Sequence, residues 1–490
     1  MRRHALAALL LSLVSGVPLA AQRVAQSEYA ARRDAVLAKI PDGVLVAFGA
    51  AEPEQDYVSF WQSSPFMYLT GFDEPDAALV VVKHDGATRS TMFVNPRDPG
   101  REVWTGTRLG VEGTTSLTGI PARDNAALDA TLDSLATLGI PFYVVGDLGN
   151  ERAAIRTADA QRVARLTAAH AGLRVQSAAT LVAQARGKKS DTELALIRRA
   201  VDITVAAQRE AMRAMAPGMN EFEIQSLIEY TFRRQGADRP SFSTIVGSGP
   251  NSTTLHYNRD DRFIADGDVV VMDIGASAGG YAADVTRTIP ANGRYSPAQR
   301  DVYRIVRDAQ AAAERQAKLG AQAKLMTDSS SAVLAAGLAK LGLIEAADAT
   351  YDCGTAAAPR TCPQFRLYYM HGIGHGIGLD VHDPDQYYFG GVIAPGSAFT
   401  IEPGIYVRAN TADILPDTPK NRAFAARIRP AVAKYANIGV RIEDDYIATP
   451  SGVEWISRAP REMEEIEVLM KQRSVGVAPR DSSLIQWRRQ

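Results

Sequence analysis

The first half of the chain combines helical patterns with short apolar runs. Polar and apolar positions predict helices over Tyr29–Ile40 and Asn125–Leu138. Four apolar runs of strand length accompany these helices, namely Val44–Phe48, Ala77–Val82, Thr91–Val94 and Phe142–Val145. Helices that alternate with short strands are typical of α/β domains. We therefore predict an α/β domain over residues 25–187.

A different pattern begins after the polar junction Gly187–Ser190. Ser190 with Glu193, and Asn220 with Glu223, have the spacing of capping boxes at helix starts. Two helices are followed by strands, the first of them at Ser241–Val246. The same order of two helices and strands then repeats. The predicted helices cover residues 190–215, 220–236, 296–320 and 328–342. The repetition predicts an internally duplicated α+β domain over residues 190–470, followed by a tail at 471–490.

The N-terminus has the pattern of a secretory signal peptide over residues 1–21. Arg2 and Arg3 precede the apolar run Ala5–Val17, and small residues follow up to Ala21. The run is shorter than the roughly 20 apolar residues of a spanning helix, so no stable membrane insertion is expected. An uncleaved anchor is the alternative. We predict an exported protein, either periplasmic or secreted.

Composition and cysteine content narrow the function further. The 490 residues contain 54 Lys and Arg against 55 Asp and Glu, and this balance argues against a nucleic-acid partner. Cys353 and Cys362 flank a short loop-like stretch, and an oxidising compartment favours a disulfide between them over two free thiols. Two cysteines also exclude a four-thiolate zinc site.

One predicted hairpin carries two carboxylates. The strand Val269–Ile274 contains Asp273, and the alternating strand Tyr281–Ile289 contains Asp284. With Ala278-Gly279 as the two-residue loop, Asp273 and Asp284 lie directly opposite each other. Two carboxylates in that position repel, and burial adds to the cost unless a divalent cation lies between them. The alternative is a register that differs by one residue, with Asp284 turned to water.

Three of the seven histidines fall within twelve positions, at His371, His375 and His382. Alternate glycines argue against a helix there and allow the backbone to pass close to a site. A lone histidine is usually structural, but this clustering favours a functional role. Glu402 and Glu443 follow on strand-like runs, where either one alone would be an ordinary surface acid. Together with the hairpin they complete a set of four carboxylates and one imidazole, which suits Mn²⁺, with Co²⁺ or Zn²⁺ as alternatives.

The order of these five residues resembles the metal ligands of the pita-bread (creatinase/aminopeptidase) metallopeptidases, in the group of aminopeptidase P and prolidase. The similarity runs from about Ser190 to Ser451 and includes Ser243–Gly249, which leads to His256. The residues on which this resemblance rests are Asp273, Asp284, His375, Glu402 and Glu443.

A second resemblance lies in the first domain. Tyr68–Pro75, Asn95–Asp98 and Glu102–Gly106 look like the N-terminal domain of aminopeptidase P, which methionine aminopeptidases generally lack. The sequence departs from that signature at Trp61 and Pro65, where Arg and Asp are usual. The subunit or substrate contacts of the first domain are therefore open.

The resemblance implies two divalent metal ions per subunit that would activate a water for peptide hydrolysis. Asp284 and Glu443 would bridge the ions, Asp273 would hold one, and His375 with Glu402 the other. Glu402 would also move the proton between the water and the leaving nitrogen.

Further residues receive supporting roles from the same resemblance. His256 and His382 would hold the substrate and the tetrahedral intermediate, and His371 would support the same pocket. Arg441, two residues before Glu443, would orient that carboxylate, and Tyr406 matches a family tyrosine near the site.

The implied reaction is release of the first residue from peptides with proline at position two, by a homodimer or homotetramer. Prolidase, a dipeptidase, is the main alternative and needs a cation for the C-terminal carboxylate of its substrate. The sequence lacks one between His382 and Glu402, although the insertion Val407–Asn437 contains six. A metal-free creatinase-like hydrolase and a non-catalytic binding protein are remote alternatives, because neither needs all five ligands.

Overall fold

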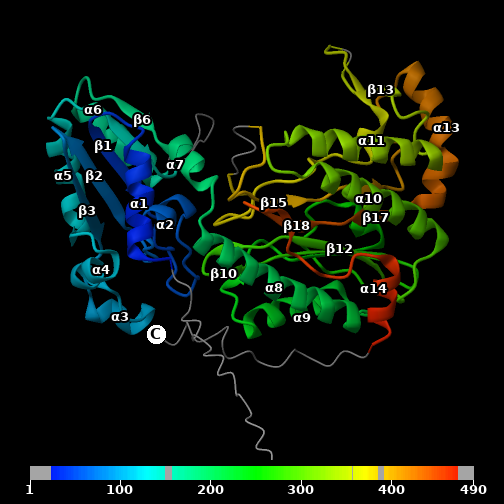
Figure 1. The fold of residues 1–490 in the computed structure, drawn as a ribbon, viewed down its shortest axis with the longest axis horizontal. Coiled ribbons are helices and arrows are strands. Elements are labelled where there is room, and N and C mark those ends of the chain that lie inside the picture. Colours follow the sequence, from blue (N-terminus) through cyan, green and yellow to red (C-terminus); the bar gives the residue numbers. More distant parts are fainter. Residues whose placement is uncertain (1–23, 149–156, 356, 385–390, 473–490) are drawn as a thin grey trace, which may run out of the picture.

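In a computed structural model of the chain, the described residues are 24–148, 157–355, 357–384 and 391–472. The predicted signal peptide and all but the first two residues of the predicted tail lie outside these ranges. Two bodies follow each other along the chain, one built on a six-stranded sheet and one in which paired helices enclose several smaller sheets (Figure 1).

The first body contains a mixed sheet of order β4-β3-β2-β1-β5-β6. Its four longest strands lie where the apolar runs predict them: β1 (Gly43–Phe48), β2 (Ala78–His84), β3 (Ala87–Val94) and β5 (Phe142–Val145). The outer strands β4 (Ala122–Asp124) and β6 (Val175–Ser177) were not predicted, because three residues are too few for a periodic pattern.

Helices cover both faces of this sheet. On one face α1 (Gln26–Leu37), α2 (Ser64–Thr70) and α7 (Ala179–Arg186) pack on inward-facing residues of the strands. On the other, α5 (Leu128–Ala136) and α6 (Ala158–Ala169) do the same. Two short helices, α3 (Pro99–Thr105) and α4 (Gly110–Thr118), follow β3. Alternating strand residues feed the two apolar cores, so the predicted α/β arrangement is observed.

The second body repeats the order of two helices and strands. Its first round consists of α8 (Asp191–Ala214), α9 (Glu221–Arg234), β7 (Arg239–Pro240), β8 (Ile245–Ser248), β9 (Val269–Ile274), β10 (Ala276–Ala278), β11 (Tyr281–Ala282) and β12 (Val285–Pro290). Both predicted capping boxes form at the starts of α8 and α9. The strand predicted at 241–246 was wrong in its bounds, because β7 and a turn precede β8.

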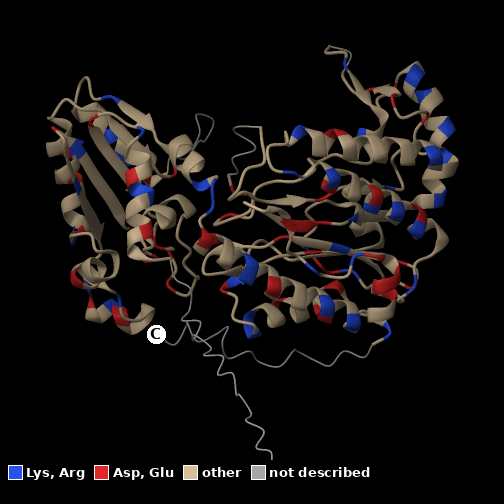
Figure 2. Ribbon diagram, viewed as in Figure 1, with Lys and Arg blue, Asp and Glu red and all other residues tan. Residues whose placement is uncertain are grey.

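The second round consists of α10 (Pro297–Gln316), α11 (Lys324–Leu341), β13 (Thr350–Asp352), β14 (Thr361–Pro363), β15 (Ala398–Ile401), β16 (Gly404–Val407), α13 (Pro419–Tyr435), β17 (Ile438–Arg441), β18 (Asp444–Thr449), β19 (Gly452–Trp455) and α14 (Met463–Met470). In Figure 1 the two helix pairs lie on opposite sides of the central strands. Figure 2 shows acidic residues on these central strands, away from the outer helix surfaces.

The register of the β9–β12 hairpin differs from the prediction. Asp273 pairs with Thr286, and not with Asp284. The loop is Gly279-Gly280, whose φ angles of 60° and 84° suit a tight hairpin turn better than a loop containing Ala278 would. The shift is two residues, so Asp284 keeps its face of the sheet and lies diagonal to Asp273.

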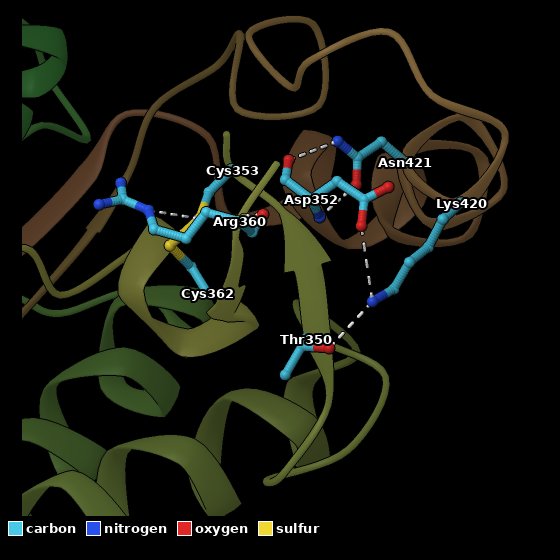
Figure 3. The surroundings of a disulfide bond; sticks show 7 residues. All are labelled: Thr350, Asp352, Cys353, Arg360, Cys362, Lys420 and Asn421. Carbon is cyan, nitrogen blue, oxygen red and sulfur yellow. Dashed lines mark hydrogen bonds and ion pairs between the residues drawn. A yellow bond between two sulfur atoms is a disulfide. The ribbon is translucent and has the colours of Figure 1, made fainter. Parts of the chain in front are cut away.

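Cys353 and Cys362 form the predicted disulfide, with sulfur atoms 2.05 Å apart (Figure 3). The bond closes the hairpin of β13 and β14, which lies against α13 through hydrogen bonds between Asp352 and Asn421. The helix α13 occupies the insertion 407–437 and was not predicted. Among the described residues, no helix is both long and apolar enough to cross a membrane.

Candidate metal centre

Four carboxylates from four separate segments meet in the second body. Asp273 lies near the end of β9, Asp284 precedes β12, Glu402 follows β15, and Glu443 lies between β17 and β18. Each acid sits in or beside an apolar strand, and sheet formation buries three of them while Glu402 stays partly exposed. Asp273, Asp284 and Glu443 are between 2% and 7% exposed.

His375 joins this cluster through its Nε2 atom. That nitrogen lies 3.5 Å from Asp284 Oδ2, 3.6 Å from Glu402 Oε1 and 3.8 Å from Glu443 Oε1. These distances exceed those of hydrogen bonds. The other ring nitrogen, Nδ1, lies 3.1 Å from the carbonyl oxygen of Gly376. An Nδ1–H donated to that carbonyl leaves the Nε2 lone pair facing the three carboxylates, as in a metal-binding histidine.

The glycine-rich segment holds His375 against β15. The Thr400 amide donates to the His375 carbonyl at 2.8 Å, and the His375 amide donates to Thr400 Oγ1 at 3.1 Å. A Cβ atom on Gly374 would lie 2.0 Å from the Thr400 carbonyl oxygen. Glycine at this position is therefore required for the close approach that the sequence suggested.

The protein itself does not neutralise the cluster. Burial and the neighbouring Glu443 raise the pKa of Asp284 well above its usual range, and burial raises that of Glu402 in the same way. Burial and Asp273 raise the pKa of Glu443 to about 8. Burial also lowers the pKa of His375 to about 4, so the ring is neutral.

Asp273 is the exception: burial acts to raise its pKa, but Arg441 together with hydrogen bonds from Thr286 and Asp284 lowers it below the usual range. Even so, three buried oxygens have no hydrogen-bond partner among the described residues: Asp273 Oδ1, Asp284 Oδ1 and Glu443 Oε1. Asp284, His375 and Glu443 offer ligand atoms within 4.8 Å of one another. Orphaned carboxylate oxygens beside an imidazole lone pair fit divalent cations.

Arg441 was predicted to orient Glu443, and the prediction named the wrong carboxylate. Its Nη2 donates to Asp273 Oδ2 at 2.6 Å, while Nη1 donates to the Tyr406 hydroxyl at 2.8 Å. The hydroxyl of Tyr406 also lies 2.8 Å from His371 Nε2. The long arginine side chain reaches across to β9, which strand alternation alone does not reveal. Arg441, Tyr406 and His371 thus form one hydrogen-bonded row beside Asp273.

The two remaining histidines lie at the open side of the cluster. His382 and His256 are exposed, and the His382 ring centroid lies 3.9 Å from that of His375. Burial and the proximity of His256 lower the pKa of His382. His371 and His375 thus lie beside the carboxylates, His382 lies against His375, and His256 lies near His382.

Two further residues contact the cluster and are not among the predicted site residues. The Thr286 hydroxyl donates to Glu443 Oε2 at 2.7 Å, and Asp445 Oδ2 accepts from the Asp284 amide at 3.1 Å. Thr286 could have been identified from its position two residues after Asp284, on the same strand face.

Comparisons with known proteins agree with this geometry. The model of metallopeptidase family M24 matches residues 195–450, and that of the aminopeptidase P N-terminal domain matches residues 29–139. The chain is 32% identical over 461 residues to the Xaa-Pro aminopeptidase of Escherichia coli K12, covering 91% of this chain and 98% of the relative. The chain belongs to metallopeptidase family M24. A second family member, the Xaa-Pro aminopeptidase of Haemophilus influenzae, is also 32% identical over 98% of its length.

Solved structures of M24 enzymes share the whole architecture. Proline aminopeptidase P II from Yersinia pestis superposes with a TM-score of 0.76 at 31% identity, covering 91% of this chain and 99% of that one. Zn-substituted E. coli aminopeptidase P in complex with product gives the same TM-score and identity over 98% of its length. The second body is thus an M24 pita-bread domain, preceded by an aminopeptidase P N-terminal domain.

Proposed function

We propose that this M24 enzyme is an Xaa-Pro aminopeptidase that holds two divalent metal ions and releases the first residue of peptides with proline at position two. The observation that carries this proposal is the geometry of His375, whose Nε2 faces three carboxylates at 3.5 to 3.8 Å without a hydrogen bond. The relatives named Xaa-Pro aminopeptidase support the substrate class.

Asp273, Asp284, His375, Glu402 and Glu443 are the residues that would hold the ions. The four carboxylates match the charge of two divalent cations, and oxygen-rich sites of this kind suit Mn²⁺, with Co²⁺ or Zn²⁺ as alternatives. When bound, the ions would supply an activated water and positive charge near the substrate carbonyl.

The protein groups then account for the proton movements and for substrate positioning. Glu402 has a raised pKa, and its Oε2 atom lies near His371 Nδ1. It is therefore suited to carry a proton to the leaving nitrogen. That nitrogen belongs to a tertiary amide without an N–H, so the leaving proline must receive a proton. The exposed His256 and His382 are placed to donate hydrogen bonds to the substrate, and Arg441 fixes Asp273.

Contacts within the insertion favour the aminopeptidase over the dipeptidase. Five of its six cations lie within ion-pair distance of acids: Lys420 with Asp352, Arg422 with Asp417, Arg427 with Glu345, Arg429 with Asp413 and Lys434 with Asp301. These contacts belong to α13 and its surroundings. They engage five of the six cations, which leaves Arg408, whose Nε has no hydrogen-bond partner among the described residues, as the one cation of the insertion that a dipeptidase could use for the substrate carboxylate.

We further propose that the protein is exported and that it self-associates as a dimer or tetramer. Support for export comes from the basic and apolar pattern at residues 1–21 and from the Cys353–Cys362 disulfide, which persists in oxidising compartments.

A panel of three peptides with Mn²⁺ tests the proposed reaction. We expect cleavage after the first residue of a longer Xaa-Pro-led peptide, and slower or no cleavage of an Xaa-Pro dipeptide and a Met-Ala-led peptide. Mass spectrometry of the products identifies the bond. Cleavage of the dipeptide alone would establish the dipeptidase instead.

A further inference from the structure

A cavity of about 230 Å³ adjoins the metal centre on the side of His382. One wall comes from the small sheet of β7, β10 and β11, and the other from the segment 379–382. His382 belongs both to this cavity and to the cluster, because its ring lies 3.9 Å from that of His375. Part of a substrate that binds to His382 can therefore extend into this cavity.

Arg239 is the cation in the lining of this cavity. It lies in β7, opposite Ser277 of β10, which fixes its backbone. Its guanidinium carbon lies 4.1 Å from the centroid of the Trp61 ring. Among the described residues, its side chain forms neither a hydrogen bond nor an ion pair, although the charges of Asp238 and of Asp380, which also lines the cavity, act on it.

The acids nearest to Arg239 already have other partners. Asp380 Oδ2 forms an ion pair with Arg186 at 2.6 Å, and its Oδ1 accepts from Ser64. Asp238 Oδ2 accepts from the Gly280 amide at 2.9 Å. Arg239 is therefore a half-buried cation whose neighbouring carboxylates are engaged elsewhere.

Stacking on Trp61 leaves the edge of the guanidinium available. A planar guanidinium that lies over an aromatic face keeps its N–H groups in the plane, where a carboxylate can accept two of them. Trp61 comes from the first domain and stands where the aminopeptidase P signature usually has Arg. The Trp61 ring at this departure from the signature therefore lies against a cation supplied by the other domain.

We propose that the cavity is a subsite for a carboxylate of the peptide substrate, bound by Arg239, with Trp61 as its positioning residue. The inference rests on the proposed peptidase function and adds a preference for anionic peptides. Three groups of a short peptide can supply the carboxylate: an acidic first residue, an acidic residue after proline, or the free C-terminus.

Four peptides distinguish these sources. Ala-Pro-Ala-amide is the neutral reference, Glu-Pro-Ala-amide and Ala-Pro-Glu-amide place the acid on either side, and Ala-Pro-Ala free acid tests the C-terminus. In the Mn²⁺-loaded enzyme we expect one of the three anionic peptides to exceed the reference in kcat/KM. We call the kcat/KM of this anionic peptide divided by that of the neutral reference the anionic ratio. Arg239→Gln should reduce this ratio by about tenfold, because it removes a charge-assisted contact.

Three further variants separate binding from general damage. Arg239→Lys should restore part of the ratio because it keeps the charge, and Trp61→Ala should reduce it less than Arg239→Gln because the cation remains but is no longer oriented. Arg294→Gln, at an exposed arginine near the end of β12, should leave the ratio unchanged. The wild-type ratio should also fall with salt.

The outcomes for the two proposals are distinct. If the neutral peptide is cleaved but Arg239→Gln changes no ratio, the carboxylate subsite is wrong and the peptidase stands. If no peptide is cleaved, the peptidase proposal fails, and calorimetry with the same uncleaved peptides decides the subsite. Tighter binding of an anionic peptide to wild type than to Arg239→Gln then supports the subsite, and equal binding overturns it.

Discussion

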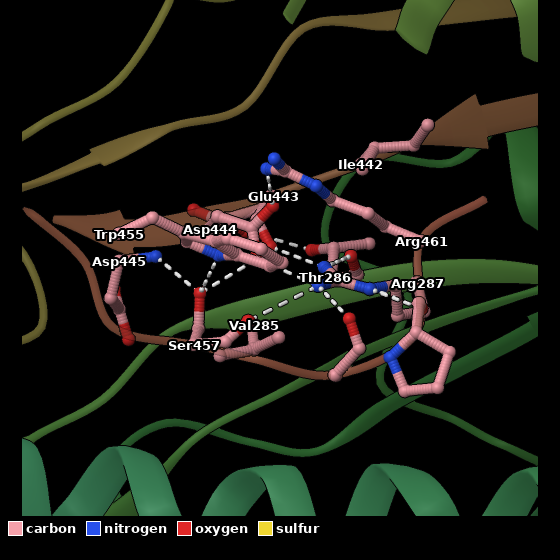
Figure 4. A network of polar contacts seen from close by, with 12 residues as sticks. Val285, Thr286, Arg287, Ile442, Glu443, Asp444, Asp445, Trp455, Ser457 and Arg461 are labelled. Atoms are coloured by element: carbon pink, nitrogen blue, oxygen red, sulfur yellow. Dashed lines mark hydrogen bonds and ion pairs between the residues drawn. The ribbon is translucent and has the colours of Figure 1, made fainter. Parts of the chain in front are cut away.

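Three consecutive acids, Glu443, Asp444 and Asp445, are all buried, yet their surroundings differ completely (Figure 4). Asp444 faces one side of its strand and meets two arginines. Glu443 faces the other side and meets further carboxylates. The comparison shows how one strand end can serve both as structure and as a site.

Asp444 is fully compensated by protein groups. Arg287 Nη2 donates to its Oδ1 at 2.6 Å, Arg461 Nη1 to its Oδ2 at 2.9 Å, and Ser457 to Oδ1 at 2.7 Å. These contacts outweigh burial and lower the pKa of Asp444. A buried carboxylate with two cations needs no further partner.

Glu443 accepts a hydrogen bond from Thr286 on one oxygen, and its other oxygen has no hydrogen-bond partner among the described residues. Burial and Asp273 raise its pKa to about 8, and burial raises that of Asp445 well above the usual range. Burial is common to all three acids, so the difference lies in the cations. Arginines make the Asp444 side a structural network, while their scarcity around Glu443 leaves a site that external cations would complete.

The largest expected effect concerns Asp273, the one cluster acid that has an arginine. Asp273→Ala should reduce turnover of an Xaa-Pro-led peptide by about 1000-fold or more, because a metal position is lost. Asp273→Asn, which keeps the shape of the side chain and an oxygen that can accept from Arg441, should give a similar loss. Steady-state kinetics with saturating Mn²⁺ measures the effect, with Asp56→Ala as an exposed control. Wild-type rates in both variants would contradict the assignment.

On the structural side, Arg287→Met should destabilise the protein by about 3–5 kcal/mol. The substitution leaves Asp444 with one arginine and removes donors to the carbonyls of Glu443, Ala459 and Pro460. Denaturant unfolding measures the free energy of unfolding, and Arg294→Met is the matched exposed control. A decrease in the free energy of unfolding below 1 kcal/mol would contradict the proposed distinction between the Asp444 network and the Glu443 side.

Another buried acid, Asp260, belongs neither to the Asp444 network nor to the carboxylate cluster, and it extends the comparison to pH dependence. Burial raises its pKa to about 7, although the Val246 amide donates to it. The folded state therefore binds one more proton than the unfolded state between about pH 4 and 7, and stability falls as pH rises through that window.

Asp260→Asn should remove this loss, which amounts to about 2–4 kcal/mol. Asparagine also tolerates the φ of 47° at this position. Unfolding free energies of both proteins at pH 5 and pH 8 test the prediction. Parallel pH profiles for wild type and variant would show that another group titrates.

The smallest expected effect has opposite signs with and without metal. In chelator-treated protein, Asp284→Asn should stabilise by about 1 kcal/mol, because it removes a buried carboxylate next to others. With Mn²⁺ present the variant should be less stable than wild type, since a ligand is missing. Thermal unfolding in both conditions measures the stability change. If Asp284→Asn changes stability in the same direction with and without Mn²⁺, the cluster does not bind the metal.

The sequence patterns predicted which residues lie together in the site. They did not predict which of these residues pair or contact one another. Asp273 and Asp284 could be placed because apolar strands on either side force them inward. Their register could not, because it depends on which two residues of the turn accept positive φ. The partner of Arg441 was wrong for a similar reason, since a long side chain reaches a neighbouring strand that one-dimensional alternation does not specify.

Elements stabilised by contacts distant in sequence were also missed. The strands β4 and β6 have three residues each and form only against the longer strands of their sheet. The helix α13 contains Pro430 and many cations, and it is held by Asp352 and by apolar residues such as Phe424 and Ile428 packed in the core. Local periodicity carries little of that information.

The most direct test of the central claim counts metal ions. The chelated protein is dialysed against Mn²⁺, and bound metal is measured by elemental analysis for wild type and for Asp284→Asn, with a melting curve for each. We expect two ions per wild-type chain, fewer in the variant, and a higher melting temperature only where ions bind. A wild-type protein that retains no divalent ion and melts unchanged with Mn²⁺ would contradict the account.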